Sequence, residues 1–323
     1  MKVLITGGAG YIGSVLVRQL LQQHYQVRVL DILNFGGESL LSVINHPDFE
    51  FIKGDVRNKK DISAGIKGID AVVHLAAIVG DPACAADPVT AQQTNYDASV
   101  QLYDTCRDSG HVKRFIFAST CSNYGKMAGE DYIDETSPLN PVSLYAKLKV
   151  EFEKYLLESK TPDYFVPTAL RFATVYGISP RMRFDLTVNE FTRDSSLGKE
   201  LIIYGKQFWR PYCHVDDLAR SCVLILESAV NKVNHEVFGV GNTQENYQKE
   251  MLVTEIQKII PDVQIKYVHK KEDPRDYKVK FSKIEKQLGF NITKTVPQGI
   301  REINFLIKNG FLADPLNKLY SNT

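Results

Sequence analysis

The sequence predicts an α/β protein, a Rossmann-like doubly wound parallel sheet with a smaller α/β lobe in the C-terminal half. Three observations predict this fold. The chain begins with an apolar run that leads into a glycine cluster, MKVLITGGAGYIG. Short apolar runs then alternate with stretches of helical periodicity, which is typical of βαβ units. The length of 323 residues is enough for one large sheet and a second lobe.

Composition excludes several classes of protein. The formal net charge is +1 and no long basic run is present, so neither nucleic acid nor an acidic membrane surface is expected as the main partner. No apolar stretch approaches the roughly 20 residues of a membrane span. The five cysteines show no CxxC pairing, which suggests reduced, packed thiols. A strand predicted from residue 2 leaves no room for a signal peptide, so a cytoplasmic location is expected.

The glycine cluster predicts a dinucleotide site. Val3, Leu4 and Ile5 suit a strand buried on both faces. Glycines at once after such a strand let the backbone approach a pyrophosphate, and the next helix directs its N-terminus at that anion. Gly8-x-Gly10-x-x-Gly13 and Gly7-x-x-Gly10-x-x-Gly13 both fit the fingerprint, and this stretch alone does not choose between them.

An acidic residue after the second strand points to NAD. Helical spacing through about residue 23 leads into a strand at 27–31 that ends in Asp31. A carboxylate about 20 positions beyond the glycines accepts hydrogen bonds from the adenosine ribose, and it would repel a 2′-phosphate. No arginine follows directly in ILNFGG, which favours NAD over NADP. The alternative is an aspartate that merely closes the strand.

Further strands are expected at 49–53, 70–77 and 115–119, with a helix over 88–109. Asp55, in GDV, could hold the adenine amino group, although a plain turn is an equal alternative. The strand over 70–77, DAVVHLAA, is the fourth of the chain and ends in small residues that allow a ligand to approach closely.

The residues that could carry chemistry come next. Ser119 and Thr120 stand at the carboxyl end of the fifth strand, where such sheets bind ligands. In the helical stretch over 143–159, Tyr145 and Lys149 share one face. A phenol is only about 0.1% ionised at neutral pH, and a general base needs its pKa lowered by roughly 3 units, about 4 kcal/mol. The Lys149 ammonium would help supply that, and Thr120 would hydrogen-bond the same substrate oxygen. Without the preceding glycine turn and strands, a Tyr and a Lys on an exposed helix face would be the better interpretation.

Taken together, TGGAGYIG, Asp31, HLAA, the hydroxyl after strand five and YxxxK resemble the extended short-chain dehydrogenase/reductase family. The resemblance selects the Gly7, Gly10, Gly13 frame. It implies a catalytic triad of Thr120, Tyr145 and Lys149, with Lys149 also on the nicotinamide ribose. The NAD-binding positions that it implies are Gly7, Gly10, Tyr11, Ile12, Gly13, Asp31, Asp55, Val56, Leu75, Ala76, Ala77, Asn95, Ser119, Tyr145 and Lys149.

The C-terminal half is similar to nucleotide-sugar epimerases and dehydratases in the order LRFATVYG, FDLTVNEF, LIIYG and WRPYCHVDDLARS. This implies a nucleotide-diphosphate sugar as substrate. The implied substrate-binding positions are Asp81, Thr120, Thr174, Ile203, Tyr204, Arg210 and Arg275, the two arginines on the diphosphate. The expected division is an NAD-binding domain of 1–177 plus about 212–243, and a substrate lobe of about 178–211 plus 244–323. The HVDD stretch is interpreted as a turn and helix cap, with no metal expected.

Departures from the family pattern narrow the range of reactions that we expect. Dehydratases of this family carry an Asp-Glu pair after the catalytic threonine, but Cys121 and Ser122 stand there, so 4,6-dehydration is not expected. Thr174 replaces a common asparagine, and Asn123 a common valine. The leading hypothesis is oxidation at C4 by hydride transfer to NAD, followed by re-reduction, which makes a 4-epimerase. Two alternatives stay open: a one-way 4-dehydrogenase or 4-ketoreductase of deoxysugar or heptose synthesis, and a non-catalytic NAD-binding sensor. The resemblance also implies a homodimer formed through helices 88–109 and 143–159.

Overall fold

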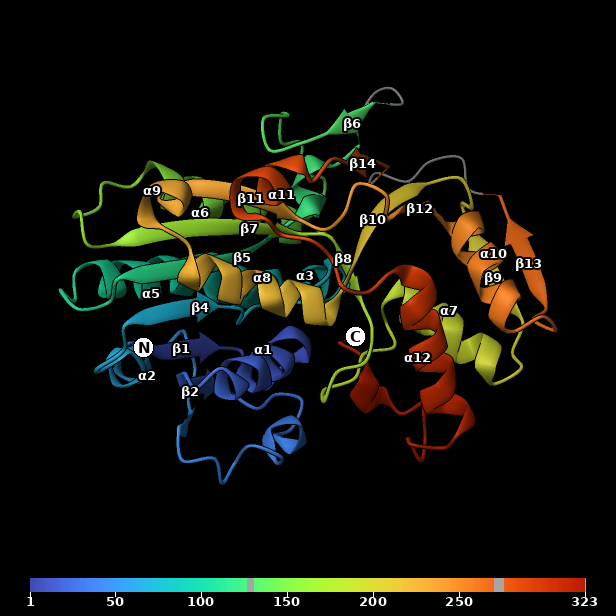
Figure 1. Ribbon diagram of the computed structural model, residues 1–323, viewed down its shortest axis with the longest axis horizontal. Helices are drawn as coiled ribbons and strands as arrows, with labels where there is room; N and C mark the ends of the chain where they lie inside the picture. The colour runs from blue at the N-terminus through green and yellow to red at the C-terminus, as the bar shows by residue number, and fades with distance from the viewer. Residues whose placement is uncertain (127–130, 270–275, 323) are drawn as a thin grey trace.

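A computed structural model describes residues 1–126, 131–269 and 276–322. Its centre is a parallel sheet of seven strands, in the order β11-β7-β5-β4-β1-β2-β3. Figure 1 shows this sheet with β11 uppermost and β2 near the lower end. The strands are β1 (Lys2–Thr6), β2 (Gln26–Asp31), β3 (Phe49–Lys53), β4 (Ala71–His74), β5 (Arg114–Thr120), β7 (Val166–Phe172) and β11 (Glu236–Val240). The predicted Rossmann-like α/β fold is therefore confirmed. The strand order reverses between β1 and β4, the point at which such sheets bind ligands.

Helices cover both faces of the sheet, and alternation along the strands explains which core each face builds. Val3 and Ile5 of β1 pack in one core with α1 (Tyr11–Gln22) and α8 (Val215–Glu227). Leu4 points the other way, into a second core with α2 (Lys59–Ile66), α5 (Ala98–Arg107) and α6 (Leu144–Glu158). In Figure 1, α1 and α8 cross in front of the sheet.

The predicted helix over 88–109 is not regular. It consists of α4 (Pro88–Gln92), a π-helical turn η2 (Gln93–Asp97) and α5. The amide of Asn95, inside the π turn, bonds both the N–H and the carbonyl of Ile78 at 2.8 and 2.9 Å. The π turn thus coincides with a tertiary contact that the helical spacing of the sequence does not reveal. Such turns are frequent at functional sites.

The smaller lobe lies to the right of the sheet in Figure 1. A three-stranded sheet of β8 (Thr174–Tyr176), β10 (Trp209–His214) and β12 (Asn246–Gln248) leads into it. Within residues 212–243, β11 pairs with β7 in the large sheet, whereas β10 pairs with β8. The expected division into an NAD-binding domain and a substrate lobe stays a prediction. The remaining elements are α3 (Asp81–Ala86), η1 (Glu38–Leu40), η3 (Cys121–Tyr124), β6 (Tyr132–Ile133), α7 (Thr187–Ser196), β9 (Leu201–Tyr204), α9 (Val230–Val233), α10 (Lys249–Ile259), β13 (Ile265–Val268), β14 (Lys278–Val279), α11 (Ser282–Leu288), α12 (Val296–Lys308) and η4 (Lys318–Tyr320).

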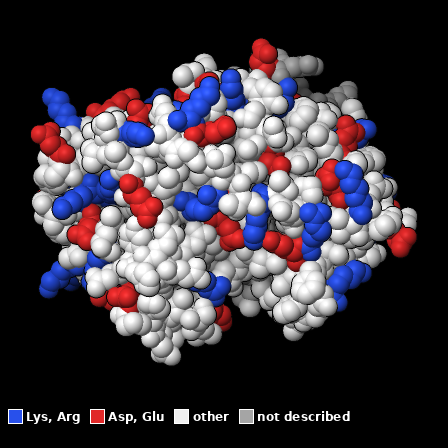
Figure 2. Space-filling view, viewed as in Figure 1, with Lys and Arg blue, Asp and Glu red and all other residues white. Residues whose placement is uncertain are grey.

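Charges of both signs are interspersed over the face shown in Figure 2, in line with the net charge of +1. Among the described residues, no helix has both the length and the apolarity that crossing a bilayer requires.

Candidate active site

The turn after β1 is built from glycines that leave no room for side chains. Gly7 has φ of 75°, and a Cβ on it would lie 2.7 Å from the Ala76 nitrogen. A Cβ on Gly13 would overlap the Gly7 carbonyl oxygen. The N-terminus of α1 has no side-chain cap and no acidic residue in its first turn. Its free N–H groups and positive dipole end therefore suit an anion such as a dinucleotide pyrophosphate.

Gly13→Ala is expected to destabilise the protein by about 1–3 kcal/mol and to weaken NAD binding, because backbone must move to admit the methyl group. Denaturant unfolding and NAD titration of the variant check this. Gly65→Ala in α2 is the matched control, since its methyl group would meet only leucine side-chain atoms, the nearest at 3.4 Å. Equal stability of the two variants would contradict the prediction.

Two carboxylates stand at the carboxyl ends of β2 and β3, and one of them contacts the glycine turn. Asp31, the last residue of β2, accepts hydrogen bonds from the N–H groups of Ala9 and Leu33 at 2.9 and 2.8 Å. Burial raises the pKa of Asp31. The carboxylate is thus tied to the glycine turn itself. Asp55 is held by Arg57 at 2.6 Å, and this hydrogen bond lowers the pKa of Asp55.

The residues directly after β4 lie against the glycine turn. The Leu75 N–H donates to the Thr6 carbonyl at 3.1 Å, which extends the β1–β4 pairing past the strand end. Ala76 is the residue that a side chain on Gly7 would strike. Asn95 then fixes Ile78 by the two bonds described above, so it shapes the loop that carries Asp81.

Thr120, Tyr145 and Lys149 come together at the carboxyl end of β5. The hydroxyl of Ser143 accepts from the Ala146 N–H at 3.2 Å and so caps α6, which places Tyr145 in its first turn. The Lys149 ammonium lies 5.9 Å from the centre of the Tyr145 ring and donates to the Ala118 carbonyl at 2.8 Å. The Thr120 hydroxyl accepts from the Ser122 N–H at 3.1 Å.

The electrostatics of Tyr145 are set by burial and by four neighbours. Burial raises the pKa of Tyr145 above that of an ordinary phenol, and the nearby Cys84 and Asp81 act in the same direction. The charge of Arg183 and a hydrogen bond with Thr120 lower it. Arg183 was not identified as a site residue from the sequence, because the segment that carries it lies far from Tyr145 along the chain.

Lys149 is buried, and burial lowers its pKa from 10.5 to about 7. The unfolded chain therefore holds the Lys149 proton across a pH range in which the folded protein has released it. Stability from this group is expected to rise with pH between about 7 and 10.5, by up to roughly 1.4 kcal/mol per pH unit.

Lys149→Met is expected to remove that dependence. The free energy of unfolding of the NAD-free wild type, measured in urea between about pH 7.5 and 9.5, should rise relative to the variant by about 2–3 kcal/mol in total. Lys147→Met, exposed on the same helix, is the control and should track the wild type. A wild-type-minus-variant difference that is constant over this range would contradict the depressed pKa.

Behind the triad lies a buried polar network. Glu153, one turn beyond Lys149 on α6, pairs with Arg171 of β7 at 2.6 Å, and both side chains are buried. Ser119 donates to Glu153 at 2.5 Å, and Asn123 donates to Ser119 at 3.0 Å. Arg171 also donates to the Tyr124 hydroxyl at 3.0 Å. The Ser119 hydroxyl, predicted to contact the cofactor, is therefore engaged with Glu153 in this structure, and its contact with NAD stays a prediction.

The predicted substrate positions lie on several elements that are far apart in the sequence. Thr174 begins β8 and pairs with Tyr212 of β10. Arg210 lies on β10, where its Nη1 donates to the Trp209 carbonyl at 2.6 Å and its guanidinium carbon lies 5.5 Å from the centre of the Tyr277 ring. Ile203 is fully buried, whereas Tyr204 is exposed. Arg275 lies outside the described residues.

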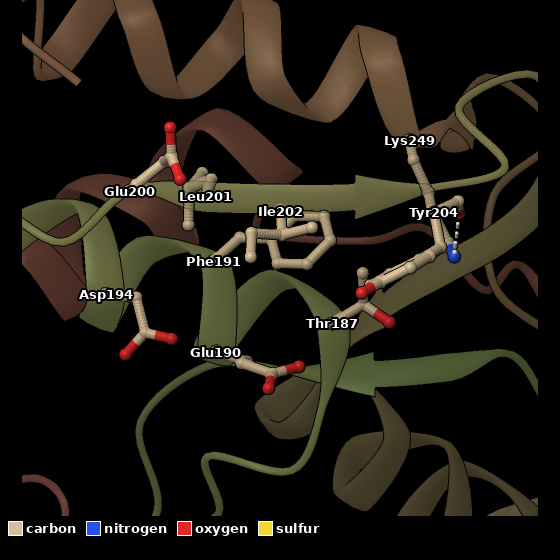
Figure 3. A pocket seen from close by; sticks show the side chains of 9 residues that line it. All are labelled: Thr187, Glu190, Phe191, Asp194, Glu200, Leu201, Ile202, Tyr204 and Lys249. Carbon is tan, nitrogen blue, oxygen red and sulfur yellow. Dashed lines mark hydrogen bonds between the residues drawn. The ribbon is translucent and has the colours of Figure 1, made fainter. Parts of the chain in front are cut away.

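A cavity of about 390 Å³ adjoins β9. Figure 3 shows its lining: carboxylates of Glu190, Asp194 and Glu200 line the α7 side and the start of β9, and Tyr204 and Lys249 close the other end. The Lys249 ammonium donates to the Tyr204 carbonyl at 2.8 Å. Burial raises the pKa of Glu190. Among the lining residues, the sequence identified only Tyr204 as a substrate position, although FDLTVNEF and LIIYG, two stretches similar to nucleotide-sugar enzymes, contain most of the lining.

The HVDD stretch is held by structural contacts. The His214 ring accepts from the Asp216 N–H at 3.1 Å and so caps α8. Asp217 accepts from the Thr293 N–H at 2.9 Å. Within the residues that the structure describes, no group of three or more His, Cys, Asp and Glu side chains is arranged to hold a metal ion.

Residues 3–241 match the model of the NAD dependent epimerase/dehydratase family. The chain belongs to this family. It is 29% identical to UDP-glucose 4-epimerase of Lactobacillus helveticus over 269 residues, which is 78% of this chain and 80% of that protein. The expected membership of the extended short-chain dehydrogenase/reductase group is thereby confirmed.

Solved structures of the epimerase/dehydratase family agree over nearly the whole chain. UDP-glucuronic acid 4-epimerase of Bacillus cereus, in complex with UDP-glucuronic acid and NAD, is 28% identical with a TM-score of 0.82, covering 96% of this chain and 99% of that one. The dTDP-glucose 4,6-dehydratase DesIV of Streptomyces venezuelae, with NAD bound, is 26% identical with a TM-score of 0.86, covering 98% of this chain and 100% of that one. The predicted cofactor, NAD, is confirmed by the family, and the cradle formed by Gly7, Gly13 and the uncapped α1 fits it. The protein is an NAD-dependent enzyme of nucleotide-sugar metabolism.

Proposed function

We propose that this enzyme is a nucleotide-sugar 4-epimerase. Tyr145 is the general base that takes the proton of the sugar C4 hydroxyl, Thr120 orients that oxygen, and Lys149 stabilises the Tyr145 phenolate. Bound NAD supplies a hydride acceptor that can return the hydride to either face of the sugar. Asp31, Asp55 and the glycine turn hold the adenosine and pyrophosphate of the cofactor, and Lys149 holds the nicotinamide ribose.

The geometry of the triad supports these roles. The Tyr145 and Thr120 hydroxyls hydrogen-bond one another at the end of β5, so both are placed to contact one substrate oxygen. Burial works against the phenolate, so the site must offset it with positive charge. Arg183 is a nearby cation, and protonated Lys149 can stabilise the negative charge that develops on the phenol oxygen.

The residue after Thr120, Cys121, is the observation that favours epimerisation over dehydration. Removal of water across C5 and C6 needs an acid and a base beside the sugar. The thiol of Cys121 instead points into the core, is 1% exposed and donates to the Arg171 carbonyl. Burial also raises the pKa of Cys121, which keeps the thiol neutral. Neither Cys121 nor the Ser122 hydroxyl is suited to act as the missing pair.

The cavity beside β9 is the proposed site of the nucleoside, with Tyr204 against the base. The predicted substrate contact of Ile203 stays a prediction, since this residue is fully buried and does not line the cavity. Arg210 and Arg275 are the proposed ligands of the substrate diphosphate, since guanidinium groups match phosphate oxygens. We also propose a homodimer formed by the α4–α5 and α6 helices. Size-exclusion chromatography with light scattering tests this oligomeric state.

The test of the reaction is turnover on a panel of UDP-, dTDP-, GDP- and CDP-sugars, with products identified by NMR and no NAD added. An epimerase should convert a sugar nucleotide to its C4 epimer with no net NADH. Stoichiometric NADH formation would indicate a one-way 4-dehydrogenase, and a 4-keto-6-deoxy product would indicate a dehydratase. Either outcome contradicts the proposal, as does tight NAD binding without turnover on any sugar.

A further inference from the structure

Two buried arginines follow β8, and sequence reasoning assigned neither of them a role. Arg181 and Arg183 are 6% and 7% exposed. Arg183 has a counter-ion, because its Nη2 and Nε donate to the Asp185 carboxylate at 2.5 and 2.9 Å. Within the described residues, Arg181 shares no such pair: the acid there that raises its pKa is Asp185, which is already bound to Arg183.

The guanidinium of Arg181 is largely unused by the protein. Its Nη2 donates to the Ser321 carbonyl at 3.2 Å, and its Nε is buried with no partner among the described residues. Its guanidinium carbon lies 4.1 Å from the centre of the Phe35 ring. Burial and the charge of Arg183 lower the pKa of Arg181 to about 10, so it remains cationic at neutral pH. A buried cation without a counter-ion is costly, and the arrangement therefore indicates a missing anion.

The surroundings of Arg181 say where that anion would lie. Two residues earlier, Ser179 donates to the Tyr11 carbonyl at 2.6 Å and hydrogen-bonds Ser14 at 3.1 Å, which fixes the segment against the first turn of α1. The Tyr11 hydroxyl donates to the Gly177 carbonyl at 2.5 Å. In Figure 1 the yellow-green segment after β8 runs beside α1.

On its other side, Arg181 touches the loop that follows β2. Phe35 lies four positions beyond Asp31, on the adenosine side of a Rossmann site. Arg181 is thus held between the two landmarks, the α1 N-terminus and the loop after Asp31, that bracket the pyrophosphate of a bound dinucleotide.

We propose that Arg181 is a ligand of the NAD pyrophosphate, contributed by the segment that leads into the second lobe. Its free N–H donors complete an anion site that the glycine turn and α1 provide from the other side. The contact ties retention of NAD to the position of the second lobe, which suits an enzyme that keeps its cofactor through many turnovers. The inference depends on the use of NAD and not on epimerisation at C4.

The test is calorimetric titration of NAD into NAD-free protein, with no nucleotide sugar present. Arg181→Met should weaken NAD binding about 10- to 100-fold, because a charge-assisted contact is lost. Adenosine, which has no phosphate, should bind the variant and the wild type equally. Arg301→Met, at an exposed position on α12, is the matched control and should leave NAD affinity unchanged.

The outcomes separate the two diphosphates that the site could meet. Unchanged NAD affinity in Arg181→Met, with weaker binding of UDP or dTDP to the NAD-loaded protein, would place Arg181 on the substrate and overturn the proposal. Thermal unfolding of the NAD-free variants checks the fold. If Arg181→Met does not fold, Arg181→Lys serves, since an ammonium cannot form the forked contact and should weaken NAD several-fold. Unchanged affinity there would also overturn the proposal. A protein that binds NAD normally but turns over no sugar nucleotide would contradict the proposed function and leave this result intact.

Discussion

Tyr145→Phe is expected to lower kcat by roughly 10²- to 10⁴-fold, the usual contribution of a positioned general base. The ring remains and only the hydroxyl is lost, so the fold and NAD binding should be unchanged. Turnover on the sugar nucleotide found in the panel, followed by NMR, measures the effect. KM should change little, because the phenol acts on the transferring proton more than on substrate affinity.

The matched control is Tyr155→Phe on the same helix. The Tyr155 hydroxyl bonds Asp104 at 2.8 Å, away from the triad, and its loss should leave turnover near the wild-type rate. Wild-type turnover in Tyr145→Phe would refute the proposed mechanism. Equal losses in the two variants would show that both act through the packing of α6, and would remove the special role of Tyr145.

The sequence predicts the sheet well because its strands are nearly continuous apolar runs. The register of β1 between β2 and β4, for example, follows from residues that are buried on both faces. The glycine turn and YxxxK are equally visible, since each lies within a short stretch of chain. The predicted fourth strand, over 70–77, ends early at His74, because the residues after it turn to lie against the glycine turn.

Parts of the site that depend on distant segments were not predictable in this way. The proposed role of Arg181 depends on its contacts with Phe35 and Ser321, which lie 146 and 140 positions away in the sequence. The π turn at Asn95 arises from a contact with Ile78 and leaves no sign in the helical spacing. Residues of α7 and β9 line one cavity (Figure 3), but the stretches FDLTVNEF and LIIYG do not by themselves place these two elements side by side.

The buried Glu153–Arg171 pair was also beyond sequence reasoning, although Glu153 stands four residues after Lys149. The pair joins α6, which carries Tyr145 and Lys149, to β7 beneath Thr120. Ser119, adjacent to Thr120, bonds the same carboxylate. We therefore expect the pair to position the triad as well as to stabilise the fold.

Glu153→Leu or Arg171→Met is expected to lower the free energy of unfolding by about 3–5 kcal/mol, because each leaves the partner's charge buried and unpaired. The double variant should cost less than the sum of the two, since no lone charge remains. Denaturant unfolding of the four proteins gives the coupling energy, and kcat at low temperature reports how far the triad shifts. Strict additivity would show that the two groups do not stabilise one another. A double variant that folds but retains low kcat would assign the pair to positioning Lys149 and Thr120, because stability would then have recovered without the geometry.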